Sequence, residues 1–194
     1  SRQQRRAPMS NVRLPLSETL GAQPRRRLAA LRRAFSVAIY VVFIVGLLLQ
    51  GLIIAYRFVN PPASTLMLGQ RLTGTTIRQT WVPLNRISPH LLRAVIMSED
   101  GQFCRHHGIN WSAIETALER GQEGLVGGGS TISMQVAKNL FLWPSKSYVR
   151  KAIELPVTLD LELFWSKRRI LEIYLNIAGW GPGLFGAEAA AQAY

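Results

Sequence analysis

The chain has 194 residues and a formal net charge of +12, from 23 basic and 11 acidic residues. This length holds one domain with appendages, and the lone cysteine, Cys104, has no internal partner, which excludes a disulfide framework.

The excess positive charge lies in residues 1–33. They hold nine arginines against one acidic residue, Glu18, which leaves 14 basic and 10 acidic groups in the rest of the chain. The arginines stand among proline and glutamine without apolar periodicity, so we expect a disordered basic tail near anionic lipid headgroups. Nucleic-acid binding needs positive charge on a folded face with groove-reading motifs, so no nucleic-acid partner is expected.

An uncharged run, AFSVAIYVVFIVGLLLQGLIIAY, extends from Ala34 to Tyr56. As a helix it would be about 34 Å long, enough for a hydrocarbon core of about 30 Å. A cleaved signal peptide would be shorter and carry a small-x-small site, and a buried core helix of this length would show a polar face. The sequence therefore predicts a transmembrane helix over 34–57. The arginines before it and the lone Arg57 after it predict a cytoplasmic N-terminus, with residues after Asn60 outside.

The rest of the chain divides into a linker and a helical domain. Residues 58–80 contain a Pro-Pro pair and glycine punctuation, which predicts a linker or a short strand pair. From Trp81 to Tyr194 helix start signals recur, so we expect a mostly α domain. The expected helices run from Ser88-Pro89 to near Glu99, from Asn110 through Arg120, from Ser130 or Thr131 to about Leu140, from Ser147 with an interruption or kink at Pro156, over 167–175, and from Gly186 onward. Glycines over 124–129 predict a mobile loop.

Two adjacent carboxylates, Glu99 and Asp100, end the first of these helices in the stretch VIMSEDGQFCRHHG. Neighbouring side chains on a helix point in different directions, so the two do not share a proton. The functional interpretation makes Glu99 a general base at the rim of an apolar surface, while Asp100 organises the turn. The alternative is a solvated helix end. His106 and His107 lack HExxH-type spacing, which favours a structural role over a metal site.

A second candidate stretch is GGGSTISMQVAKN, from Gly127 to Asn139. If a helix begins at Thr131, its free N–H groups form an anion-binding end, and Lys138 lies one heptad later near the same face. No GK[ST] follows the glycines, so this is not a P-loop. The alternative is an ordinary capped helix after a flexible loop.

A third stretch, SYVRKAIE, places Arg150 and Glu154 four residues apart, on one helix face. Taken alone, such a pair is typical of a solvated salt bridge worth a few tenths of a kcal/mol. KRRILEIYLN (167–176) is a basic amphipathic helix, which alone indicates core and rim.

In this order, these stretches resemble the motifs of the peptidoglycan glycosyltransferases of family 51, and most closely its monofunctional biosynthetic transglycosylases. The five motifs are EDGQFCRHHG (99–108), GSTISMQVAKN (129–139), RKAIE (150–154), KRRILEIYLN (167–176) and GPGLFGAEAAAQAY (181–194). The resemblance covers about 81–194. It implies a lysozyme-like α-helical domain that is C-terminally incomplete, because related proteins continue through further helices.

The resemblance implies polymerisation of lipid-linked disaccharide-pentapeptide, lipid II, into glycan strands at the outer face of the bacterial inner membrane. Glu99 matches the glutamate that deprotonates the acceptor 4-hydroxyl for attack on the donor's anomeric carbon. Glu154 matches a second essential carboxylate. A single displacement inverts that carbon. The leaving group is a lipid pyrophosphate, for which Lys138, Lys146 and Arg150 are the expected cations.

The same motifs imply further substrate-binding residues, a set made up of Asp100, Phe103, His106, Ser130, Thr131, Gln135 and Asn139. No protein metal site is expected and no cofactor is required, although Mg²⁺ or Mn²⁺ is compatible with pyrophosphate binding. The implied partners are lipid II, the growing glycan strand, the membrane, and cell-wall synthesis or division proteins. Phosphoglycolipid inhibitors of the moenomycin type bind such enzymes as donor mimics. Two departures are Met134, where the family has a second glutamine, and Gly179, where a glutamate is common.

Two other functions fit the same sequence. A membrane-anchored, lysozyme-like peptidoglycan hydrolase would use Glu99 as a general acid, and would not need clustered cations for a neutral polysaccharide. A non-catalytic scaffold for cell-wall or division machinery would leave both glutamates replaceable.

Overall fold

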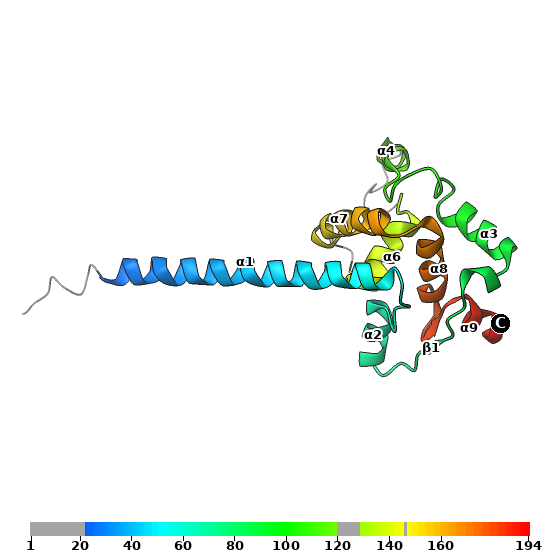
Figure 1. Ribbon diagram of the computed structural model, residues 1–194, viewed down its shortest axis with the longest axis horizontal. Coiled ribbons are helices and arrows are strands. Elements are labelled where there is room, and N and C mark those ends of the chain that lie inside the picture. Colours follow the sequence, from blue (N-terminus) through cyan, green and yellow to red (C-terminus); the bar gives the residue numbers. More distant parts are fainter. Residues whose placement is uncertain (1–21, 120–128, 146) are drawn as a thin grey trace, which may run out of the picture. The chain divides into compact units, whose positions relative to one another are not determined.

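The computed structural model describes residues 22–119, 129–145 and 147–194 (Figure 1). The chain divides into two compact units, residues 1–48 and residues 49–194. Lys146 lies outside the described residues, as does the loop expected over 124–129 except for Gly129. The described part is mostly helical, which confirms the predicted fold class.

The longest helix, α1 (Ala22–Tyr56), includes the predicted membrane span. Its stretch Arg27–Tyr56 reaches a mean hydropathy of 2.7, and its side chains are almost entirely exposed. Among the described residues it is the one helix long and apolar enough to cross a membrane, as expected of a single-pass anchor. The tail expected to be disordered is helical from Ala22 on, because this stretch is rich in the strong helix formers alanine, leucine and arginine.

The last turns of α1, from residue 49 on, belong to the second compact unit. Ile53 is fully buried in its core. The Trp165 indole donates to the Ile53 carbonyl oxygen at 2.7 Å, and Arg169 Nε donates to the Tyr56 carbonyl oxygen at 2.9 Å. These donors satisfy carbonyl groups that a helix end leaves without intrahelical partners.

The segment expected as a linker, residues 58–80, carries a short helix, α2 (Thr65–Leu72). It begins at Ser64, whose Oγ accepts from the Met67 backbone N–H at 3.2 Å. Met67 is fully buried, and α2 packs against α6 (Ile132–Phe141). One buried methionine gives no helical period, so the sequence pattern does not reveal this helix.

The predicted helix starts are largely confirmed. The other helical elements of the described chain are the 3₁₀ turn η1 (Leu84–Arg86), α3 (Pro89–Glu99), α4 (Trp111–Glu119), α6, α7 (Tyr148–Phe164), α8 (Lys167–Ile177) and α9 (Ala187–Ala193). The side chains of Ser88, Asn110, Thr131 and Ser166 each accept a backbone N–H of the turn that follows, at 3.1–3.3 Å. These short polar residues therefore cap their helices as expected.

Helix α7 continues through Pro156, where an interruption or kink was expected. Proline removes the hydrogen bond to the carbonyl oxygen four residues earlier, here that of Ala152. Both residues lie on the exposed face of the helix, where the loss of one intrahelical hydrogen bond does not affect a buried residue. The expected interruption is therefore wrong.

Helix α6 lies at the centre of the second unit, with α7, α8 and α2 packed around it (Figure 1). Its buried residues include Ile132, Val136 and Leu140, at the four-residue spacing of one helix face. Helix α8 contributes Ile170 and Ile173, both fully buried, to the same core. Close packing on several sides fixes α6, which carries several of the predicted site residues.

A small three-stranded sheet of order β1–β3–β2 joins distant parts of the second unit. Strand β1 (Arg78–Gln79) is parallel to β3 (Leu184–Phe185), and β2 (Gly179–Gly181) is antiparallel to β3. Between β2 and β3, Gly183 has a φ of +69°, and a Cβ there would lie 2.2 Å from the Thr76 carbonyl oxygen. The turn therefore requires glycine.

Candidate active site

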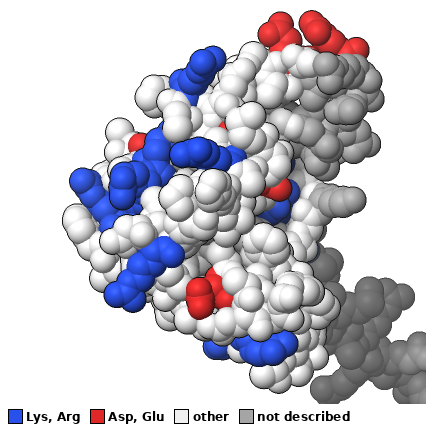
Figure 2. All heavy atoms as spheres, turned by 90° about the vertical axis from the view of Figure 1, so that its right-hand side faces the viewer, with Lys and Arg blue, Asp and Glu red and all other residues white. Residues whose placement is uncertain are grey.

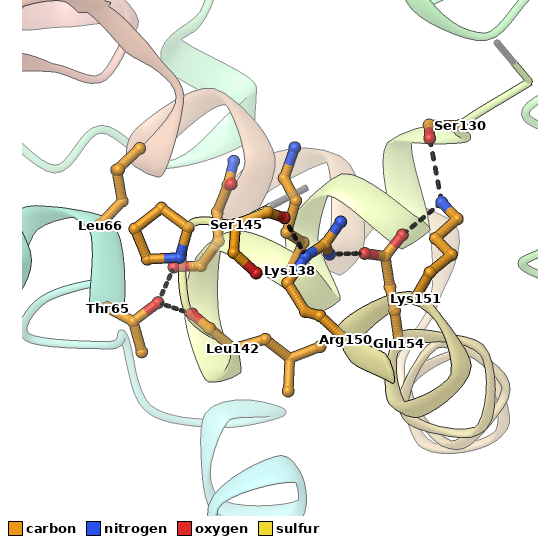
Figure 3. Close-up of a pocket in the computed structure, with 11 residues that line it drawn as sticks. Thr65, Leu66, Ser130, Lys138, Leu142, Ser145, Arg150, Lys151 and Glu154 are labelled. Carbon is orange, nitrogen blue, oxygen red and sulfur yellow. Dashed lines mark hydrogen bonds and ion pairs between the residues drawn. The ribbon is translucent and has the colours of Figure 1, made fainter. Parts of the chain in front are cut away.

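A cavity of about 560 Å³ is lined by α2, α6, α7 and the segments beside α6 (Figure 3). Its wall combines three cationic side chains, one carboxylate, hydroxyl groups and an apolar side. The lining residues are Thr65, Leu66, Ser130, Lys138, Asn139, Leu142, Pro144, Ser145, Arg150, Lys151 and Glu154. This volume is typical of cavities that bind small ligands.

Glu154 is the carboxylate of this cavity and is only 1% exposed. Arg150 Nη1 donates to Glu154 Oε2, which is the predicted i, i+4 pair, and Lys151 Nζ donates to Glu154 Oε1 at 2.7 Å (Figure 3). All three side chains are buried, so the alternative of a solvated surface pair is wrong. One carboxylate between two cations leaves a net positive charge in the wall of the cavity.

Lys138 lines the same cavity from α6 (Figure 3). Burial lowers the pKa of its amine; Glu154 opposes this shift, while Arg150 and Lys151 lower the pKa further. No carboxylate in the part of the chain that the structure describes forms an ion pair with this amine. An anionic ligand would therefore meet an available cation here, and its charge would stabilise the protonated amine.

The remaining wall is partly apolar. Thr65 Oγ1 lies within hydrogen-bond distance of the carbonyl oxygens of Asn139 (2.9 Å) and Leu142, which ties the start of α2 to the end of α6. The side chains of Leu66 and Leu142 line the cavity on this side. The cavity thus places cations next to apolar surface, a combination suited to an amphipathic anion.

Glu99 is exposed at the end of α3 and is not among the residues that line the cavity. Its Oε2 accepts from Gln135 Nε2 at 2.9 Å, so the first two motifs meet at this contact. Its negative charge acts on two neighbouring groups: burial raises the pKa of Tyr174 to about 12 with a contribution from Glu99, and Glu99 weakly opposes the lowering of the Lys138 pKa. The end of α3 thus presents an exposed carboxylate next to α6, the helix that carries Lys138.

Asp100 is buried and joins the turn after α3 to the start of α6. Its Oδ2 accepts from the Ile132 backbone N–H at 3.0 Å, and His106 Nε2 lies 2.9 Å from each carboxylate oxygen. Thr131 Oγ1 donates to the Gly108 carbonyl oxygen at 2.5 Å and accepts from the Met134 N–H. The N-terminus of α6, expected to bind a ligand anion, instead binds the carboxylate of Asp100, which the helix dipole stabilises there.

The predicted site residues thus fall into distinct places. Ser130, Lys138, Asn139, Arg150 and Glu154 meet in the cavity, with Ser130 Oγ accepting from Lys151 Nζ at 3.1 Å. Phe103 is only 1% exposed and packs in the core, and with Asp100, His106 and Thr131 it lies apart from the cavity lining. The expected substrate contacts of this second group have no support in the cavity and stay predictions.

Six residues that line the cavity were not predicted as site residues: Thr65, Leu66, Leu142, Pro144, Ser145 and Lys151. Lys151 stands three residues before Glu154 on one helix, and this spacing is a signal that could have identified it. Thr65 lies more than 70 positions before Asn139 and Leu142, whose carbonyl oxygens it approaches, and no local pattern indicates that it or Leu66 lines a cavity.

Charged side chains of both signs are exposed on one face of the second unit. Figure 2 shows most of the lysine and arginine side chains in view gathered on its left, with others at the lower edge, and acidic side chains scattered among uncharged residues. Clustered positive charge attracts anions over distances of about 10 Å.

Comparison with known proteins gives a consistent result. The model of the family described as Transglycosylase matches residues 67–194. Among similar curated proteins, a biosynthetic peptidoglycan transglycosylase of Rhodospirillum centenum is 53% identical over 149 residues, which cover 76% of this chain and 64% of that protein. A protein of the same name from Pasteurella multocida is 51% identical over 150 residues, covering 73% and 61% of the two chains.

A third protein of that name, from Caulobacter vibrioides, is 44% identical over 165 residues, covering 84% of this chain and 71% of the relative. The chain spans 64% and 61% of the length of the first two relatives, which is less than two thirds. The family match begins at Met67 in α2, so it includes part of the segment expected to be a linker.

Proposed function

Because this chain belongs to the transglycosylase family, whose domain has a lysozyme-like α fold, we propose that it is a peptidoglycan glycosyltransferase. It polymerises lipid II into glycan strands, inverts the donor's anomeric carbon and releases the lipid pyrophosphate. The observation that carries this proposal is the cavity in which Lys138, Arg150 and Lys151 surround the buried Glu154.

The cationic cavity binds the donor through its pyrophosphate. Negative charge grows on the leaving pyrophosphate as its bond to the sugar breaks, and fixed cations stabilise that charge without rearranging. Glu154 holds Arg150 and Lys151 in place, while Lys138 meets the phosphate oxygens directly. A hydrolase of a neutral polysaccharide has no use for this arrangement, which favours the transferase over that alternative.

Glu99 is the general base. It removes the proton from the acceptor's 4-hydroxyl as that oxygen attacks the anomeric carbon of the donor. The new carbon–oxygen bond forms on one side while the bond to the pyrophosphate breaks on the other, so the configuration inverts and no sugar–enzyme bond forms. The Gln135 amide, which donates to Glu99, orients the carboxylate toward the acceptor.

A divalent ion finds no protein site among the described residues. No group of three or more potential ligands occurs there, and both oxygens of Glu154 accept from cations. Mg²⁺ prefers oxygen ligands, carboxylates above all, and the one carboxylate that lines this cavity is already paired with two cations. We therefore propose that Lys138, Arg150 and Lys151, rather than a protein-bound metal ion, neutralise the pyrophosphate.

The apolar helix α1 suits an enzyme whose substrate is a lipid. We place the protein in the bacterial inner membrane as a single-pass protein, with residues 1–33 in the cytoplasm and the catalytic domain on the periplasmic side. The support for this orientation is the cluster of nine arginines before the span, against the lone Arg57 directly after it.

The orientation gives a direct prediction. A reporter enzyme that folds only outside the cytoplasm is expected to be active when fused after Asn60, and a reporter that requires the cytoplasm is expected to be inactive there. Fusions before residue 22 should behave in the opposite way. Activity of the cytoplasmic reporter after Asn60 would overturn the orientation.

The function itself is tested by incubating the complete protein, solubilised in detergent, with lipid II. Glycan polymer and free lipid pyrophosphate are the expected products. Cleavage of preformed glycan without polymer would instead identify a hydrolase. If neither reaction occurs and lipid II does not bind, a non-catalytic cell-wall scaffold is the function that still fits.

Replacing Lys138 with alanine is expected to weaken donor binding by about 1.5–3 kcal/mol, the range for a hydrogen bond to a charged group. Affinity for a phosphoglycolipid donor mimic of the moenomycin type should fall by a similar amount. Calorimetry or fluorescence titration of the detergent-solubilised variant measures both. Unchanged affinity for the two ligands would remove Lys138 from the donor site.

The variant Lys138→Arg is the matched control, because it retains the positive charge. Burial lowers the pKa of the lysine amine, so the unsubstituted protein loses this charge at a lower pH than an exposed lysine would. An arginine stays protonated above pH 12. Donor-mimic affinity should therefore persist to higher pH in the arginine variant than in the unsubstituted protein.

A further inference from the structure

We propose that Glu162 is a positioning residue that holds the loop of residues 100–110, and with it Glu99, in register with α6. The inference rests on the proposed function, since Glu162 acts through the loop that follows the general base. Glu162 belongs to α7 and is not among the residues that line the cationic cavity.

The first observation is a partly buried polar cluster formed by three helices. The Glu162 side chain is 6% exposed, and its Oε1 accepts from Ser133 Oγ in the first turn of α6. The same oxygen accepts from Lys167 Nζ, at the start of α8, at 2.6 Å. The Glu162 carboxylate of α7 thus forms hydrogen bonds to side chains of both α6 and α8.

The second observation links this cluster to the loop. Lys167 Nζ lies 4.5 Å from the ring centroid of Phe103, a cation–π contact with a buried aromatic residue of the loop. The Phe103 ring meets His106 edge-on at 6.3 Å, and His106 contacts Asp100, the residue next to Glu99. A continuous set of contacts therefore runs from Glu162 to the neighbour of the general base.

The third observation is a close approach of the Gly108 backbone to the Glu162 side chain. Gly108, at the far end of the loop, has a φ of +87°, and a Cβ there would lie 2.9 Å from Glu162 Cγ. The loop can rest on the Glu162 side chain only because residue 108 is glycine. The Gly108 carbonyl then accepts from Thr131, at the start of α6.

These contacts matter because Glu99 has one side-chain partner among the described residues, Gln135 of α6. Glu99 and Gln135 meet only if the loop and α6 keep their relative position. The base must also face a hydroxyl bound beside the cavity, and misplacement by about 1 Å can cost about 100-fold in rate. Glu162 contacts both the 100–110 loop and α6, and it does so without contacting the substrate.

The test compares Glu162→Gln with Glu172→Gln in the complete protein in detergent. Glu172 is a matched control, because its carboxylate is also partly buried and paired with a cation, Arg169 at 2.5 Å, and its other oxygen accepts from the Leu84 N–H of η1 and not from the loop. Glu162→Gln should reduce lipid II polymerisation about 10- to 100-fold. Its affinity for a phosphoglycolipid donor mimic should change less than about threefold, because Glu162 does not line the cavity. The control, Glu172→Gln, should retain both the polymerisation rate and the donor-mimic affinity.

Hydrogen–deuterium exchange gives a readout independent of activity. Amides of residues 100–110 and of Ile132, which donates to Asp100, should exchange faster in Glu162→Gln than in Glu172→Gln. Equal exchange in the two variants would overturn the inference, as would retained turnover or a parallel loss of rate and donor-mimic affinity. If Glu162→Gln does not fold, Lys167→Met tests the same contact. Absence of polymer from the unsubstituted protein would refute the proposed function, while exchange would still decide whether Glu162 holds the loop.

Discussion

Replacing Glu99 with glutamine is expected to reduce lipid II polymerisation at least about 100-fold, because general bases contribute about 10²- to 10⁴-fold. Glutamine keeps the size of the side chain and an oxygen that accepts from Gln135, but it cannot take a proton. Donor affinity should barely change, because the base acts on the acceptor. Turnover of labelled lipid II and titration with a donor mimic measure the two effects separately.

The position of Glu99 makes this variant easy to interpret. The residue is exposed at the end of α3, so the substitution should leave the thermal unfolding midpoint nearly unchanged. Glu115→Gln, an exposed change on α4, is the control. A Glu99→Gln protein that polymerises lipid II within a few-fold of the unsubstituted rate would eliminate Glu99 as the base, while the family assignment would stand.

Glu154→Gln is expected to have the largest effect on stability. The carboxylate is buried between Arg150 and Lys151, and its loss leaves two neighbouring buried cations without a counter-charge. Removing one partner of a buried ion pair typically costs about 3–5 kcal/mol, and we expect the free energy of unfolding to fall by that amount. Denaturant unfolding in detergent measures the loss.

The same variant should also lose donor affinity, which separates it from Glu99→Gln. Arg150 would no longer be oriented by its carboxylate partner, and the cavity would lose the geometry that meets the pyrophosphate. Low temperature keeps the folded fraction high enough for titration, and Glu115→Gln again serves as the control. Normal donor-mimic affinity in folded Glu154→Gln protein would contradict this role.

Local signals in the sequence predicted much of the domain. Serine, threonine and asparagine caps determine helix starts through bonds to the next turn, so α3, α4, α6 and α8 begin where expected. The pairing of Arg150 with Glu154 follows from a fixed helical spacing. Neither signal depends on the rest of the fold, and for that reason both could be read without it.

Features that depend on tertiary packing could not be predicted. The burial of Phe103 and the carboxylate of Asp100 at the start of α6 both require the loop and the helix to meet in space. Thr65 lines the cavity because α2 packs against α6, and no residue pattern within 58–80 predicts that contact. The sequence therefore predicted which charged residues matter, while their burial and their contacts are set by the tertiary fold.

The docked end of α1 limits how anchors can be exchanged between proteins. A chimaera that replaced α1 through Tyr56 with a foreign membrane helix would withdraw the Ile53 side chain from the core of the second unit. It would also shift the backbone carbonyl groups of residues 53 and 56, which accept hydrogen bonds from Trp165 and Arg169. A junction placed before residue 49 would keep every one of these contacts. The freedom of the anchor sequence to vary thus ends about two helical turns before the anchor itself does.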